Sequence, residues 1–408
     1  MMRLVSSRWA MWLAMIIVGA AGTFVLFAPD FVATDWLSEG TRARLLRDDH
    51  EISVFHDRGS WVTQGVTPYD ASIFQEYPQI GLGYITLPYI FTGGYDTYRT
   101  VFIIMNLAVY LGLVYVTVRL LRRLQRSPWL VLLLALPSLL YFGMNRFDVL
   151  VALGVQIGLW LVLSRRWRMA AIVFAIAILT KWYPVIFVPL MYLYIRQTEG
   201  VMARSSQRQF LGYGAAVVIG FLALSFVFDG FTSLRPYFFH GARPGGVGSL
   251  YYLFVQGPLL STGIEQLNYL GLTIFLLLQF SLPLVALIQP RVLMRYLTTP
   301  AQLAGWMALG VLIFTLCSRF YSPQWIIWAV PLIILVADKR LIWLVVVYDI
   351  LNYASFPLIW QVWGPQSFGY AAISAVIILC TVLIIYTLYL IRMNSSVDDA
   401  LRVNHQLK

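Results

Sequence analysis

Long apolar stretches separated by short polar segments dominate this chain. A stretch of about 20 apolar residues crosses the hydrocarbon core of a membrane, and shorter ones fit when they are tilted, broken or buried inside a bundle. The pattern predicts an all-α polytopic membrane protein of about 12 transmembrane helices. The candidate spans are 9–28, 98–118, 128–144, 147–163, 169–180, 182–195, 209–228, 267–288, 302–317, 325–337, 341–358 and 369–391.

Two longer segments interrupt this regular alternation, and we assign both to the outer side. They are 29–97 and 229–266, within a single integral membrane domain that covers 1–408. In the first segment, the apolar run Ile80 to Phe91 is too short to span and is broken by Gly and Pro, which favours a re-entrant or interfacial helix. Apolar residues between Ile52 and Trp61 recur at roughly helical spacing, which indicates an amphipathic helix on the membrane surface.

The charge distribution predicts the orientation. Only 12% of the residues are charged, compared with about 25% in soluble domains, and the formal net charge is +11. Most of the 29 basic residues fall on the loops of one side, and most of the 18 acidic residues fall on the other. Positively charged loops face the cytoplasm. We therefore expect a multi-pass plasma-membrane protein with both termini cytoplasmic, and membrane lipids rather than nucleic acid as the partner of its positive charge.

A few basic residues contradict this charge rule because they lie on the predicted outer side. Such residues need a reason other than topology, and a negatively charged ligand is one such reason. The residues are Arg58, Arg99, Arg146, Lys181, Arg235, Arg243 and Arg319.

Four carboxylates crowd the segment that follows the first span. Asp48, Asp49, Glu51 and Asp57 lie within ten residues. Closely spaced carboxylates raise one another's pKa, and a partly buried carboxylate that titrates near neutrality can act as a general base. The alternative is a solvated acidic loop. The apolar residues interleaved with the acids favour a group held at the lipid–water boundary.

A second polar group begins the predicted span 147–163 and ends the next one. Asn145, Arg146 and Asp148 precede the first of these spans, and Lys181 follows the second. An Arg146–Asp148 or Lys181–Asp148 ion pair is one interpretation. A cationic site for a lipid phosphate is the other, since arginine makes forked contacts with phosphate and lysine supplies a point charge.

Three more outer segments carry candidate binding residues. The stretch Gly65 to Tyr89 contains Tyr69 and Glu76 among turn residues and aromatic residues. The stretch Asp229 to Phe254 reads as a mobile loop that could close over a substrate. The turn that begins at Cys317 could equally be an ordinary surface turn. The candidate residues of the last two segments are Arg235, His240, Arg243, Arg319 and Gln324.

Several motifs in this order resemble the GT-C superfamily, and most closely family 87 of polyprenyl-phosphate-sugar-dependent glycosyltransferases, a mannosyltransferase-like group. They are G-V-T-P-Y and E-Y-P, then N-R-F-D and T-K-W-Y-P, then S-P-Q-W, between about 45 and 335. The resemblance implies a GT-C-like helical bundle with interfacial helices in its first outer loop. It also implies an active site on the outer face.

The resemblance further implies inverting transfer of a sugar, by default mannose, from a polyprenyl-phosphate donor to a glycan or glycolipid acceptor. The family's acidic residue stands four positions before an aromatic residue and fourteen before the glycine of G-x-x-P-Y, and this position holds Glu51 here. Asp49 lies two residues away, so either could be the catalytic base, with Asp57 ranked lower. The scheme needs no metal and no cofactor beyond the lipid-linked donor.

In this scheme one carboxylate takes the acceptor proton, the hydroxyl attacks the sugar carbon in line, and outer cations stabilise the departing phosphate. Lys181, Arg146, Arg235 and Arg243 are the candidate cations. A polytopic transporter or lipid flippase is the alternative function. A transporter is expected to show repeated halves and charges at the bilayer midplane. The sequence has no clear internal repeat, and Asp349 is the only acidic residue deep in a predicted span.

Overall fold

A computed structural model describes residues 2–27, 45–69, 76–242, 246, 248–252, 265–365 and 367–406. All regular secondary structure in these ranges is helical, which confirms the predicted all-α class. Helices occupy every one of the predicted apolar stretches, so hydrophobic patterning located the elements correctly.

Fewer helices are long and apolar enough to cross a membrane than predicted. Five segments of the described residues meet both conditions, and the number rises to seven if each of two bent helix pairs is one span, so the count of about 12 is not confirmed. The five segments are Arg8–Phe27 of α1 (Met2–Phe27), Tyr95–Arg123 (α5), Tyr183–Phe238, Lys339–Trp363 and Phe368–Ile391 of α19 (Phe368–Gln406).

The two bent pairs contain a break at or near a proline. The 3-10 helix η2 (Pro128–Ala135) meets α6 (Pro137–Asn145) at 68°, and α12 (Glu265–Gln279) meets α13 (Ser281–Ile288) at 67°. Proline restricts the residue before it to extended backbone and cannot donate a helical hydrogen bond, so a straight helix cannot continue through Pro137. Each bent pair fits a broken span or a re-entrant loop.

Shorter apolar helices fill the interior of the bundle. They include α7 (Asp148–Leu163), α8 (Trp167–Thr180) and α15 (Pro300–Leu316), and most of their side chains are buried. α7 and α8 approach so closely that a Cβ atom on Gly158 would lie 2.6 Å from the ring of Phe174. These helices, of 14 to 17 residues, are therefore packed largely against other helices, although Met169 and Ile176 of α8 are exposed.

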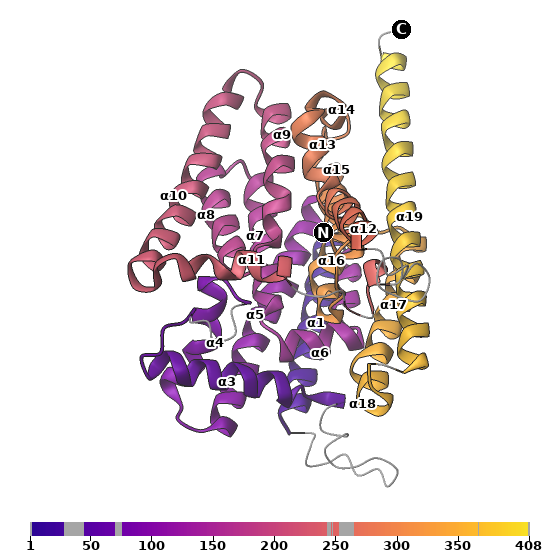
Figure 1. Cartoon of the computed structure of the whole chain (residues 1–408). Helices are drawn as coiled ribbons and strands as arrows, with labels where there is room; N and C mark the ends of the chain where they lie inside the picture. Colours follow the sequence, from indigo (N-terminus) through magenta and orange to yellow (C-terminus); the bar gives the residue numbers. More distant parts are fainter. Residues whose placement is uncertain are drawn as a thin grey trace.

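Two helices of the first predicted outer loop lie across one end of the bundle, at the bottom of Figure 1. They are α3 (Asp49–Thr63) and α4 (Gln79–Phe91), and they pack together so tightly that a Cβ atom on Gly59 would meet Tyr89 at 2.9 Å. The helix predicted between Ile52 and Trp61 is therefore present. Its location at a membrane surface stays a prediction. The short α18 (Trp360–Trp363) is at the same end, which we call the α3 end.

The opposite end, which we call the α14 end, brings together loops predicted to share the inner side. It contains α14 (Pro290–Met294), the turn between α9 (Val188–Glu199) and α10 (Ala203–Asp229), and the end of α19 (Figure 1). Arg165 forms an ion pair of 3.5 Å with Glu199. These loops gather at one end of the molecule, and the membrane side that this end faces remains a prediction.

The one acidic residue predicted deep in a span caps a helix. Asp349 of α17 (Lys339–Tyr353) is fully buried and accepts hydrogen bonds from the backbone N–H groups of Ser138 and Leu139, at 2.9 and 3.1 Å. These two donors are in the first turn of α6, where helix geometry leaves N–H groups without partners. Asp349 therefore supports the bend before α6.

Candidate active site

A cavity of about 720 Å³ lies among residues from α12, α15, α19 and the turn η7 (Pro323–Trp325), together with the segment that follows α8. Eleven of its 24 lining residues are aromatic, and four predicted site residues, Glu76, Lys181, Arg319 and Gln324, are among its lining side chains. The full lining is Glu76, Pro78, Lys181, Trp182, Tyr183, Tyr237, Gly246, Gly248, Leu272, Leu276, Gln279, Phe280, Phe314, Ser318, Arg319, Phe320, Tyr321, Ser322, Gln324, Trp325, Trp328, Trp360, Pro365 and Tyr370.

Lys181 is held at the cavity wall by an ion pair. It follows the last residue of α8, and its Nζ lies 2.7 Å from Oδ1 of the fully buried Asp148. The indole N–H of Trp328 donates to the same oxygen at 2.8 Å. The rings of Phe147 and Trp328 lie 5.0 and 5.4 Å from Nζ, within cation–π range. The predicted Lys181–Asp148 pair is therefore present, and it points a fixed cation at the cavity.

An aromatic stack supports this wall. The ring of Tyr183 lies parallel to that of Trp328 with centroids 4.0 Å apart, and Trp325 stacks on Trp328 at 5.1 Å. Trp325 and Trp328 are three residues apart, so they lie on one face of the turn that leads into α16 (Ile326–Ile333). Tyr183, Trp325 and Trp328 were not among the site residues predicted from the sequence. The Trp-x-x-Trp spacing that begins in the S-P-Q-W segment could have indicated that two of these rings lie on one helix face.

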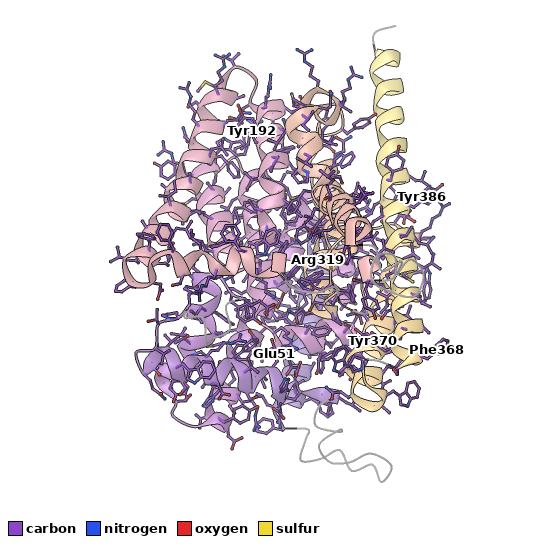
Figure 2. The ribbon with its side chains drawn as sticks, in the orientation of Figure 1. Glu51, Tyr192, Arg319, Phe368, Tyr370 and Tyr386 are labelled. Carbon is purple, nitrogen blue, oxygen red and sulfur yellow. The ribbon has the colours of Figure 1, made fainter. Side chains whose placement is uncertain are left out.

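Arg319 supplies the second cation of the cavity. Its backbone carbonyl accepts hydrogen bonds from Gly246 N–H at 3.0 Å and from the Ser249 hydroxyl at 2.8 Å, and its guanidinium lies 5.6 Å from the ring of Tyr251. The segment that carries Arg319 is therefore held by the residues between Gly246 and Tyr251 that the structure describes. Figure 2 labels Arg319 near the middle of the molecule and Tyr370, another lining residue, lower down.

Glu76 brings a carboxylate to the same cavity. The next residue, Tyr77, is buried, and its ring packs against Phe147 with centroids 4.7 Å apart. Pro78 then precedes α4, and Gln79 accepts a hydrogen bond from the hydroxyl of Tyr237 at 2.9 Å. Glu76 is therefore placed by neighbours that cannot move without unpacking the protein.

Arg146 does not join Asp148 but binds the acidic segment before and in α3. It forms ion pairs with Asp48 and with Glu51, the latter at 2.6 Å, and Glu51 also accepts a hydrogen bond from the hydroxyl of Tyr77 at 3.1 Å. Asn145 accepts a hydrogen bond from Asp48 N–H at 3.0 Å. This network fastens α3 to the end of α6, and none of its four charged or amide side chains lines the cavity.

Asp49, the other predicted base, is part of a separate ion-pair cluster. Its Oδ1 lies 2.7 Å from Nε of Arg47, accepts from the Tyr95 hydroxyl at 3.2 Å, and lies 3.8 Å from Arg99. The structure therefore separates Asp49 from Glu51, since the two carboxylates have different partners. Neither lines the cavity, although Tyr77 connects Glu51 to its edge.

Arg58, Tyr69 and Arg235 are the other predicted binding residues whose contacts are described. Burial lowers the pKa of the Arg58 guanidinium, and the nearby Tyr77 and Glu76 partly offset this decrease. The guanidinium lies 5.2 Å from the centre of the Tyr77 ring. Arg235 donates to the carbonyl of Tyr69 at 3.1 Å, which joins α11 (Arg235–Ala242) to the first loop. His240 is a residue of α11, but the structure does not describe its side chain. Arg243 lies outside the described residues.

Metal ligands were not predicted, and the described residues contain no group of three His, Cys, Asp or Glu placed to hold a metal ion. Cys317 and Cys380 are both buried free thiols.

A family model described as Glycosyltransferase family 87 matches residues 76–319, which is more than half of the chain. The matched segment contains Glu76, Lys181 and Arg319, and it begins after Asp49 and Glu51. No curated protein matches the chain.

Proposed function

Because the chain belongs to glycosyltransferase family 87, we propose that it moves a sugar from a polyprenyl-phosphate donor to an acceptor hydroxyl in the cavity beside Lys181 and Arg319. Mannose is the expected sugar and a glycan or glycolipid the expected acceptor. The observation that carries the proposal is the pair of cations in one aromatic-lined cavity within a membrane protein. No metal or cofactor takes part in the proposed scheme.

The charge change of the reaction supports a site with fixed cations. When the bond between the sugar and the phosphate breaks, the polyprenyl phosphate leaves with one more negative charge. Arg319 and Lys181 are already in place to stabilise that charge, and preorganised charges of this kind lower a barrier most in sites that exclude water. Loss of one such group typically lowers kcat by about 100- to 1,000-fold.

The composition of the cavity walls supports a lipid-borne donor. Leu272, Leu276 and Phe280 line the cavity, and they belong to or adjoin α12, half of a bent apolar pair that is a candidate membrane span. A polyprenyl chain in the bilayer could therefore reach the cavity without leaving apolar surroundings. The α3 end is proposed to face the outside, because the positively charged loops gather at the opposite end.

The experiment uses membranes from cells that express the protein, with radiolabelled polyprenyl-phosphate mannose as the probe. Transfer of label into membrane glycan is expected, and Arg319→Gln should reduce it about 100-fold or more. Arg165→Gln is the matched control, since Arg165 lies at the α14 end with its side chain 69% exposed. Transfer from a nucleotide sugar instead, or movement of an unaltered lipid or solute without transfer, would contradict the proposal.

A further inference from the structure

One carboxylate shares the cavity with both cations, and it is not one of the two that the sequence favours as the base. Glu76 lines the cavity together with Lys181 and Arg319, whereas Asp49 and Glu51 do not. A general base must come within hydrogen-bond distance of the hydroxyl that it deprotonates. Position therefore favours Glu76 among the described acidic residues near the site.

The partners of the other acidic residues also limit them as bases. Glu51 is bound at 2.6 Å by Arg146, and Asp49 at 2.7 Å by Arg47. These partners hold both carboxylates outside the lining of the cavity. Asp148 is closest to Lys181, but it is completely buried and its Oδ1 already accepts from Lys181 and Trp328.

The residues that follow Glu76 are held by contacts to other parts of the protein. Tyr77 is buried and its hydroxyl donates to Glu51, and Gln79 bonds the carbonyl of Ser233 at 3.1 Å and the hydroxyl of Tyr237 at 2.9 Å. Catalytic groups act best when neighbouring contacts hold them in position. Arg58 lies within electrostatic range of Glu76, so a cation is also present beside this carboxylate.

We propose that Glu76 is the general base of the transfer reaction, a role that rests on the proposed function of the cavity. The acceptor hydroxyl gives its proton to the Glu76 carboxylate, and its oxygen forms a bond to the anomeric carbon. The bond from that carbon to the donor phosphate breaks, and its electron pair leaves with the polyprenyl phosphate. Arg319 and Lys181 stabilise the charge that develops there.

The test compares single-turnover transfer by Glu76→Gln with transfer by the wild type, using the donor that the wild type consumes. This choice keeps the two proposals separate, because the identity of the donor is established on the wild type alone. Glu76→Gln should lower kcat by about 100- to 10,000-fold, while donor binding, measured by thermal shift, stays within a few-fold of the wild type. Asp96→Asn is the matched control, since Asp96 is an outer-loop carboxylate whose side chain is 85% exposed.

Azide provides a readout that loss of folding or binding could not produce. Azide is an anion and needs no base, so it should attack the anomeric carbon in Glu76→Ala and release polyprenyl phosphate together with a glycosyl azide. Arg319→Gln should not respond, because its defect concerns the leaving group. Wild-type transfer by Glu76→Gln would overturn the proposal. So would a folded, inactive Glu76→Ala that azide does not restore, or azide rescue of Glu51→Ala or Asp49→Ala in its place.

Discussion

The ion pair between Lys181 and Asp148 gives the sharpest prediction about stability. In the variant Lys181→Met, Asp148 would keep its full burial but lose the ammonium group at 2.7 Å. Its Oδ1 would retain the indole N–H of Trp328, and its Oδ2 has no hydrogen-bond partner among the described residues. A completely buried carboxylate would thus be left with one neutral donor.

The expected cost follows from the burial of both partners. Removing one partner of a buried ion pair destabilises a protein by about 3–5 kcal/mol, because the other charge remains without compensation. A typical protein has only about 5–15 kcal/mol of net stability, so this loss is large. The second variant, Lys181→Met with Asp148→Asn, removes the charge and keeps an oxygen for Trp328. It should recover more than half of the lost stability.

Reversible unfolding in detergent, followed by circular dichroism, measures both variants against the wild type. The single variant should unfold at a clearly lower denaturant concentration than the double variant. Neither should regain sugar transfer, since both lack the cation at the cavity. If Lys181→Met were as stable as the wild type, or if the double variant were the less stable of the two, Asp148 would not be a buried charge that depends on Lys181.

Three further changes test other parts of the structure by the same unfolding measurement. Arg146→Met should cost about 3–5 kcal/mol, because it leaves the buried Asp48 without its cation; an unchanged stability would show that α3 is not fastened there. Gly81→Ala places a Cβ atom 2.5 Å from the backbone oxygen of Thr180, so it should cost about 1–3 kcal/mol by pushing α4 from α8, and a neutral effect would contradict this close contact. Asp349→Ala leaves two buried N–H groups at the start of α6 without partners, so it should cost about 1–3 kcal/mol, and retained stability would argue against this cap.

Hydrophobic patterning could predict the long helices because they lie in apolar runs, and the helical spacing of apolar residues predicted α3, which does not lie in such a run. It could not predict how many of them cross a membrane. The apolar runs that hold α7 and α15 look like short spans, but their burial depends on neighbours that come from distant parts of the chain. Pro137 indicated the bend before α6 in the sequence. The cap by Asp349 could not be predicted, because Asp349 lies 211 and 210 residues away from Ser138 and Leu139, whose N–H groups donate to it.

The sequence could predict which residues belong to the candidate site, but not which of them contact one another. Lys181 and Asp148, 33 residues apart, were recognised as a possible pair because they flank neighbouring spans. Arg146 was expected near Asp148, but it turns to Asp48, 98 residues earlier in the chain. The spacing of the family motif favoured Glu51 as the catalytic base. The structure instead favours Glu76, because Glu76 lines the cavity, and the cavity is formed only by the folded chain.

The most direct test of the account is the location of the donor phosphate. A cryo-electron microscopy structure of the protein in lipid nanodiscs with a polyprenyl monophosphate would show it. The account predicts a phosphate in the cavity within hydrogen-bond distance of Arg319, with the isoprenoid chain passing along α12. A phosphate held by the arginine-rich loops at the α14 end, with the cavity empty, would contradict it.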